Sequence, residues 1–146
     1  MQALRFDKNE FPEEVLKRHR LQSIGDEVRI YFAKPDAVLP VLLNGEPRFI
    51  LWGNRRKLDI PRTGFCKRES FEARKWLWFK PKPVTIIASA ALVNGVWFQV
   101  RQGIQGLLLV SKDGDTHGYI MTQPSTHYFR TMTGSERMPI LINQIV

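Results

Sequence analysis

Short apolar runs separated by turn-forming residues make up most of this chain of 146 residues. Three stretches, residues 39–53, 88–100 and 107–122, each carry Asn-Gly or Asp-Gly between two strand-like runs. These pairs accept the positive φ of a tight hairpin turn. We therefore expect turns at Asn44-Gly45, Asn94-Gly95 and Asp113-Gly114. Three hairpins predict an antiparallel sheet that folds over into a barrel.

Two stretches have helical rather than strand-like patterns. In residues 11–21, Pro12 lies in the first turn, and acidic residues precede basic ones, which suits the helix dipole. The second predicted helix, residues 69–79, ends at a Lys-Pro-Lys-Pro sequence because proline cannot continue the helical hydrogen bonds. The pattern as a whole predicts one α+β domain over residues 1–146, predominantly antiparallel and barrel-like, with a few short helices.

The positive charge of the chain is concentrated in one segment. Residues 55–82 contain ten basic and three acidic side chains, a net charge of +7 within a chain total of +8. Aromatic residues interleave with these cations, and proteins hold single-stranded nucleic acid with cations on phosphates and rings on bases. We expect this segment and its flank to bind single-stranded DNA. The predicted contacts are Trp52, Arg55, Arg56, Lys57, Arg62, Lys67 and Arg68.

Several classes of protein do not fit the sequence. A single cysteine, Cys66, excludes a disulfide framework and multi-cysteine metal sites and suits a reducing, cytoplasmic compartment. The histidines at 19, 117 and 127 are too scattered to predict a metal site, and no phosphate-binding glycine loop occurs. We expect no metal, no cofactor and no membrane span. The sequence carries no signal for an oligomeric state.

A series of motifs in a particular order does point to a family. The series comprises Arg5-Phe6, residues 40–53, a basic stretch ending in Glu69-Ser70, an Asn-Gly hairpin, a threonine-containing strand, and Arg-Met-Pro-Ile-Leu-Ile at 137–142. This order resembles the SRAP family, the SOS response-associated peptidase-like proteins that act on abasic sites in single-stranded DNA.

The resemblance implies a compact α+β fold with a positively charged groove, and crosslinking to the abasic sugar through an N-terminal cysteine. It places Lys67 and Glu69 at the positions of a family arginine and glutamate. It also adds Arg5 and Arg137 to the predicted DNA contacts.

The family's reactive residues are replaced in this chain. Ala3, or Gln2, stands where the family has its cysteine, and Ser135 stands where it has a histidine. The family's catalytic glutamate falls on Phe98 or, with a shift of one residue, on Gln99. None of these side chains supplies a thiolate, a carboxylic acid or an imidazole. We therefore expect a divergent SRAP-like DNA-binding protein without the cysteine-dependent crosslink.

Two other functions remain open at this stage. An amine condenses with an aldehyde, so the α-amino group of Met1 or the side chain of Lys67 could capture an abasic sugar as a Schiff base, with Glu69 moving a proton. Alternatively, the basic segment of a non-catalytic interaction module could bind an acidic protein.

Overall fold

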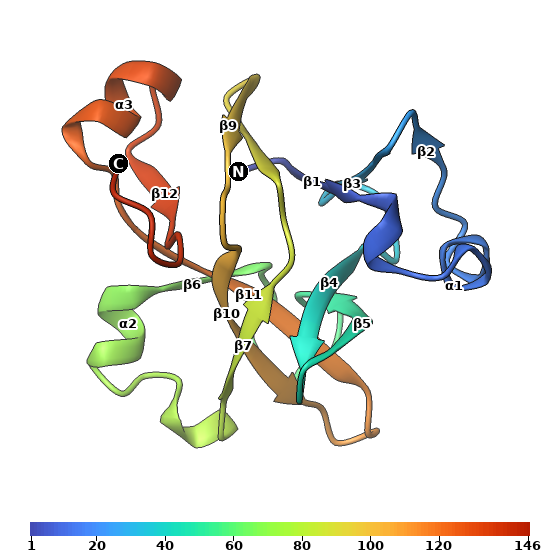
Figure 1. Ribbon diagram of the computed structural model, residues 1–146. Helices are drawn as coiled ribbons and strands as arrows, with labels where there is room; N and C mark the ends of the chain where they lie inside the picture. Colours follow the sequence, from blue (N-terminus) through green and yellow to red (C-terminus); the bar gives the residue numbers. More distant parts are fainter.

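Two β-sheets form the structure, a computed structural model that describes residues 1–146 (Figure 1). The first sheet has the strand order β2-β3-β1-β8-β9, and every pairing in it is antiparallel. Its strands are β1 (Ala3–Asp7), β2 (Ser23–Ile24), β3 (Glu27–Tyr31), β8 (Ala90–Val93) and β9 (Val96–Gln99).

The second sheet closes into a barrel of five strands. The strands in the ring are β10 (Ile104–Val110), β7 (Lys82–Ile86), β4 (Val38–Leu43), β5 (Glu46–Trp52) and β11 (Thr116–Pro124). Pairing of β10 with β11 closes the ring. Two short strands, β6 (Phe65–Lys67) and β12 (Arg137–Pro139), also pair with β11. The predicted antiparallel, barrel-like α+β fold is confirmed, with parallel pairing only between β11 and its neighbours β5 and β6.

Both predicted helices are shorter in the structure, and α3 was not predicted. The helices are the 3-10 helix η1 (Lys8–Glu10), α1 (Glu13–Arg18), α2 (Arg68–Glu72), the 3-10 helix η2 (Leu77–Phe79) and α3 (His127–Thr133). The helix predicted over 69–79 is interrupted because Arg74 has a φ of +63°, which no α-helix contains. None of the helices is long and apolar enough to cross a membrane.

The Asn-Gly turns have the geometry that the sequence predicts. Asn44 and Gly45 have φ of +51° and +81°, and Asn94 and Gly95 have +47° and +78°. Asp113-Gly114 also lies at a chain reversal, but there only Gly114 has a positive φ, of +89°. The reversal is a five-residue loop, residues 111–115, instead of a tight primed turn. Its extra length allows side chains of the loop to take part in the network described below.

Strands β10 and β11 are buried on both faces. Leu108 and Ile120 belong to the main hydrophobic core, which contains residues of both sheets. The residues on either side of them point the other way into a second core of eight residues: Ile60, Cys66, Trp76, Leu107, Leu109, Tyr119, Met121 and Ile140. Through Trp76, this second core anchors the segment between α2 and η2 on the outside of the barrel.

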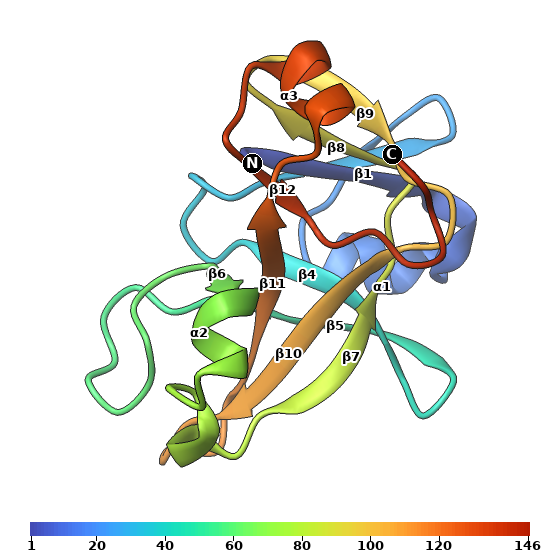
Figure 2. The same cartoon turned by 90° about the vertical axis from the view of Figure 1, so that its left-hand side faces the viewer.

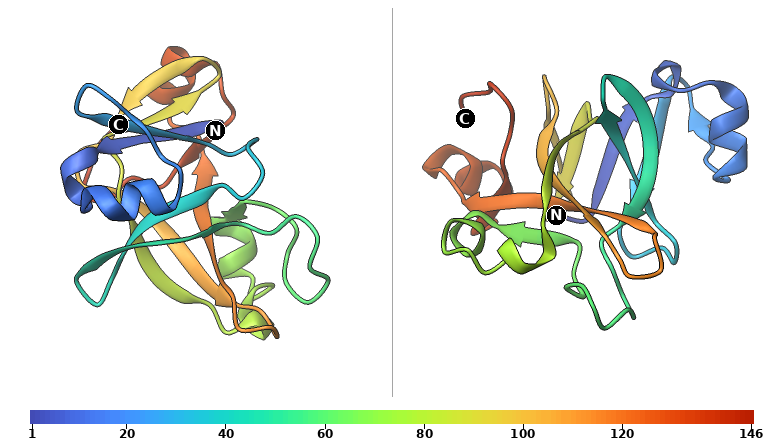
Figure 3. Two further views of the ribbon diagram at one scale, coloured as in Figure 1. Left: turned by 90° about the vertical axis from the view of Figure 1, so that its right-hand side faces the viewer. Right: turned by 90° about the horizontal axis from the view of Figure 1, so that it is seen from below.

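The basic segment, residues 55–82, runs along one side of the molecule. Figure 2 shows it in green, as the loop before β6, then α2 and η2. Helix α1 lies on the opposite side, as both views of Figure 3 show. The charge concentrated in the sequence is therefore also concentrated in space.

Substitution of Gly53 by alanine should destabilise the fold. Gly53 follows β5 with a φ of +65°, and a Cβ there would lie 2.6 Å from the Gly64 Cα and overlap the Thr63 carbonyl. We expect Gly53→Ala to lower the free energy of unfolding in urea by roughly 2–4 kcal/mol. Gly45→Ala is the control, because Gly45 has a φ of +81° but open space around it. Its expected loss is about 1 kcal/mol, and equal losses would contradict the close approach at Gly53.

Candidate functional site

Arg137 connects three elements at one end of β11. Its guanidinium donates two hydrogen bonds to the Glu69 carboxylate, at 2.6 and 3.3 Å, and a third to the Thr122 hydroxyl, at 2.9 Å. The hydrogen bonds from Arg137 lower the pKa of the Glu69 carboxyl, which is therefore ionised at neutral pH. A fork of this kind fixes the positions of both charged groups.

The pairing of β11 with its short partners brings these residues together. Thr122 lies opposite Lys67 of β6 on one side and opposite Pro139 of β12 on the other. Because α2 begins at Arg68, directly after β6, Glu69 falls in its first turn. The backbone thus places the predicted site residues Lys67, Glu69 and Arg137 around the end of β11, although they are up to 70 positions apart in the chain.

Ser135 supports the backbone of Arg137 and is not aimed at a substrate. Its hydroxyl donates to the Arg137 carbonyl at 2.7 Å and accepts from the Arg137 amide at 3.2 Å. Side-chain bonds of this kind to nearby backbone are common for serine. The residue at the family's histidine position therefore shapes the start of β12.

Hydrogen bonds link this region to the start of the chain. The Ser135 amide donates to the Thr133 hydroxyl, and the Asn94 side chain donates to the Thr133 carbonyl. The next residue, Gly95, donates its amide to the Gln2 side chain at 3.0 Å. Figures 1 and 2 show the N-terminus beside β12 and the adjoining end of β11.

Met1 is half-buried against the main core. This burial lowers the pKa of its α-amino group below the ordinary value of 8.0. A larger fraction of this amine is therefore uncharged at neutral pH than in an exposed chain terminus. The side chain of Lys67, by contrast, is exposed.

The other positions matched to the family's reactive residues form no hydrogen bond with the Arg137 side chain. Ala3 is fully buried in β1 between Tyr31 and Leu92. Phe98 packs on Phe129, with ring centroids 4.8 Å apart, so it belongs to the core. Gln99 is exposed on β9, which is the edge strand of the first sheet, opposite Ala90.

Cys66 does not replace the missing nucleophile. Its side chain is fully buried in the second core, and burial raises the pKa of its thiol to about 12. The thiolate, which is the reactive form, is therefore almost absent near neutral pH.

Lys57 was a predicted DNA contact, but it serves as a structural cation. Its ammonium donates to Asp113 at 2.8 Å and to Asp115 at 2.7 Å, both in the β10–β11 loop. It also lies 3.0 Å from Nε2 of His117. The Nδ1 of His117 faces the Gly53 carbonyl at 2.7 Å and must donate to it, which leaves Nε2 to accept from Lys57.

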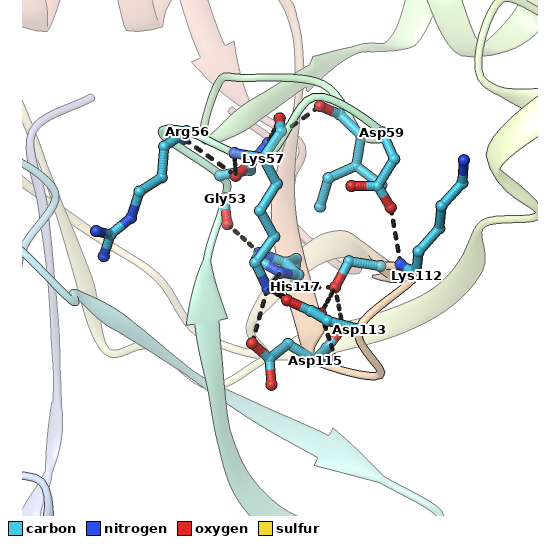
Figure 4. A network of polar contacts seen from close by, with 11 residues as sticks. Gly53, Arg56, Lys57, Asp59, Lys112, Asp113, Asp115 and His117 are labelled. Carbon is cyan, nitrogen blue, oxygen red and sulfur yellow. Dashed lines mark hydrogen bonds and ion pairs between the residues drawn. The ribbon is translucent and has the colours of Figure 1, made fainter.

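Figure 4 shows the Lys57 side chain directed into this network, while the neighbouring Arg56 points away from it. Two carboxylates neutralise the Lys57 ammonium, which is therefore not available as a free cation for phosphate. Sequence reasoning missed the network because its partners are more than 50 positions from Lys57.

Trp52 is likewise excluded as a base-stacking residue. It is 2% exposed, and its indole N–H donates to the Gly64 carbonyl inside the protein. Phe32 and Phe65 pack on its ring with centroids 5.1 and 6.1 Å away. No face of this indole remains for a base.

Most of the predicted cations are free of ion pairs. Arg5 pairs with Glu27 at 3.3 Å, and Arg137 pairs with Glu69 as described. Of the ten basic residues in the segment 55–82, only Lys57 forms a salt bridge. The nine others are Arg55, Arg56, Arg62, Lys67, Arg68, Arg74, Lys75, Lys80 and Lys82.

Sequence reasoning missed several members of this free set as individual contacts. They are Arg74, Lys75, Lys80 and Lys82, which were counted only in the charge of the segment. It also did not single out Thr122, for which the threonine-containing strand before Arg-Met-Pro was the available signal. No group of three His, Cys, Asp or Glu side chains is arranged to hold a metal ion.

No known family model matches the sequence, and no curated protein is found to be similar to it.

Removal of the Lys57 ammonium should weaken the fold in a pH-dependent way. Hydrogen bonds from Lys57 and Ser111 hold the pKa of the Asp113 carboxyl below its usual range. The resulting stabilisation is fully present above the ordinary pKa of aspartate, about 3.9, and is lost as pH falls through the lower folded value. We expect Lys57→Met to lower the Tm at pH 7, and the difference from wild type to shrink below about pH 4.

Lys112→Met is the matched control for this experiment, because Lys112 lies in the same loop but forms no ion pair. The two variants should differ clearly in Tm at pH 7. Equal Tm values across the pH range would show that the Lys57 network contributes nothing specific.

Proposed function

We propose that this protein is a divergent SRAP-like protein that binds single-stranded DNA, including abasic strands, without the family's thiol crosslink. The observation that carries this proposal is the set of nine basic residues in 55–82 that have no acidic partner. They stand along one side of the molecule on a framework anchored by the second core.

Unpaired surface cations favour a polyanion as the ligand. Each cation that contacts a phosphate releases a condensed counterion, which drives binding regardless of sequence. Internal ion pairs, such as Arg5 with Glu27, remove cations from this role. The difference between paired and unpaired cations favours a binding path for the phosphates, here called the phosphate path, that runs over Lys67, Arg68 and residues 69–82. A path over the first sheet is less favoured.

The Glu69–Arg137 pair fits a role in shaping the end of this path. Its opposite charges balance, so it contributes little net attraction for phosphate. By holding α2 against β12, it fixes where Lys67 and Arg68 present their charges. Because Glu69 is ionised at neutral pH, it has no proton to donate, and its lowered pKa makes it a weak proton acceptor that is better suited to orient a cation.

A specific observation favours a second candidate function, amine chemistry on abasic DNA. Burial lowers the pKa of the Met1 α-amino group, and the N-terminus lies beside β12. Condensation of this amine with the C1′ aldehyde of an abasic sugar forms a C=N bond and releases water. Loss of the 2′ proton from this imine would then expel the 3′ phosphate and cleave the strand.

Loss of Lys67 and Arg68 should weaken DNA binding more than loss of two other exposed cations. We expect Lys67→Gln with Arg68→Gln to lower the affinity for a single-stranded oligonucleotide by roughly 10- to 30-fold at about 0.1 M salt. The slope of log affinity against log salt should fall in magnitude by about 1.4, at about 0.7 per phosphate contact. Fluorescence anisotropy across a salt series measures both quantities.

The control variant, Lys17→Gln with Arg18→Gln, removes the same charge from α1 on the opposite side of the molecule. It should leave the affinity within about twofold and the salt slope unchanged, because side chains far from the bound strand release no counterions. If both double variants lowered the DNA affinity equally, binding would depend only on the total charge of the protein and not on a site at Lys67 and Arg68. Failure of the wild-type protein to bind single strands at all would overturn the proposed function.

An abasic oligonucleotide should form no heat-stable adduct with the protein. Neither Ala3 nor the buried Cys66 supplies an accessible thiolate to close a thiazolidine ring. If the Met1 amine reacts, its imine should be trapped only by borohydride. Its yield should rise with pH and level off below the ordinary α-amino value of 8.0, because the pKa of this group is lowered. Denaturing gels with and without borohydride measure this.

Acetylation of the N-terminus separates the two possible amines. Loss of the reducible band in the acetylated protein would assign it to Met1, whereas its persistence, with loss in Lys67→Gln, would assign it to Lys67. A shifted band that survives heating without reductant would contradict the absence of the thiol-type crosslink. Absence of any reducible band would leave DNA binding as the function and remove the amine chemistry.

A further inference from the structure

The segment between α2 and β7 exposes two large apolar side chains at its tip. Trp78 is 88% exposed, and the adjacent Leu77 is 63% exposed. Tryptophan carries a large apolar ring and is highly buried on average, so the exposure of nearly the whole Trp78 residue departs from the usual pattern. The flanking aromatic residues, Trp76 and Phe79, are instead turned inward.

These inward rings hold the tip in a defined shape. The Trp76 ring packs edge-on against Tyr119 at 5.1 Å and against Phe79 at 6.1 Å. Arg74 and Lys80, on either side of the tip, have φ of +63° and +50°, an uncommon backbone state for residues other than glycine. Packing therefore holds the tip in one conformation, so a ligand can contact Trp78 without first having to order a flexible loop.

Unpaired cations flank the exposed Trp78 in the sequence. The segment 71–82 contains Arg74, Lys75, Lys80 and Lys82 against one carboxylate, Glu72, and none of the five forms a salt bridge. Only residues 69–76, which include most of α2, separate Lys67 and Arg68 from this tip along the chain. The cluster thus continues the phosphate path proposed above and adds a flat ring to it.

We propose that Trp78 is a stacking residue for a base of single-stranded nucleic acid, so that the bound strand extends from Lys67 and Arg68 along α2 to the tip. This inference rests on the proposed function and adds a second contact to it. A ring with free faces between cations is the arrangement by which proteins hold single strands without reading their sequence. Basic residues lie within a few positions on either side of Leu77 and Trp78 in the sequence. The apolar surface of the tip is therefore small for insertion into a membrane, and its size suits one base.

Substitutions of Trp78 separate stacking from simple apolar contact. Trp78→Phe retains a ring, Trp78→Leu retains apolar bulk without a plane, and Trp78→Ala removes both. Tyr128→Ala is the control, because Tyr128 is an exposed aromatic residue of α3, away from the basic segment. Each variant is titrated with deoxythymidine oligonucleotides of about 4 and about 12 nucleotides, lengths that bracket common single-strand footprints.

The longer strand should reach the tip, and the shorter one should occupy only the region of Lys67 and Arg68. We expect Trp78→Ala and Trp78→Leu to lower the affinity for the longer strand by roughly 5- to 100-fold. Both should leave the affinity for the shorter strand unchanged. Trp78→Phe should recover most of the loss, and Tyr128→Ala should match wild type. Binding of the longer strand should also quench tryptophan emission in the wild type and much less in Trp78→Phe.

Three outcomes overturn the inference. Equal binding of the longer strand by wild type and Trp78→Ala would remove Trp78 from the interface while leaving the proposed function in place. Wild-type affinity of Trp78→Leu for the longer strand would show that the side chain contributes apolar burial and not ring stacking. Sedimentation with vesicles containing anionic lipid, abolished by Trp78→Ala in a protein whose DNA binding is unaffected, would assign the tip to a membrane. If wild type binds neither strand, the proposed function fails instead.

Discussion

The candidate site depends on the hydrogen bonding of one strand, β11. Over its nine residues this strand pairs with β10, β5, β6 and β12, so its backbone groups are shared among four partners. Both of its faces are buried, one in each hydrophobic core. A strand held in this way cannot shift in register without exposing apolar side chains. It therefore determines where β6, α2 and β12 meet.

Ion pairing divides the basic residues of the chain into two kinds. Lys57 and Arg137 lie against carboxylates that hold parts of the fold together, and their charge is balanced locally. The others in the segment 55–82 have no such partner and repel one another along one side of the molecule. A surface of this kind is stabilised by binding a polyanion, which removes the repulsion. The same segment therefore serves in part as structure and, in the function proposed here, in part as a binding surface.

The sequence predicted the elements that are determined locally. The Asn-Gly pairs at 44–45 and 94–95 form the expected turns, because two residues with positive φ suffice to reverse two paired strands. The helix predicted over 69–79 was wrong beyond Glu72, since burial of Trp76 and Phe79 in the second core requires a different backbone path. Tertiary packing outweighs helical propensity there.

The composition of the site was less predictable than the fold. The alternating pattern of a strand identifies Trp52 as an apolar position. It does not indicate that the rings of Phe32 and Phe65 pack against the Trp52 ring. In the same way, nothing near Lys57 indicates Asp113 and Asp115 as its partners. Such contacts come from pairing between distant strands. The sequence likewise did not determine whether Lys67, Glu69 and Arg137 lie together, because pairing of β11 with β6 and β12 is what brings them to one place.

Protection of individual lysines by bound DNA is the most direct test of the binding surface. Acetylation of the native protein by a small reagent, followed by mass spectrometry, reports the accessibility of each lysine with and without a single-stranded oligonucleotide. We expect DNA to protect Lys67, Lys75, Lys80 and Lys82 and to leave Lys8, Lys17 and Lys112 unchanged. Uniform protection of all these lysines, or protection confined to Lys8 and Lys17, would contradict this expectation.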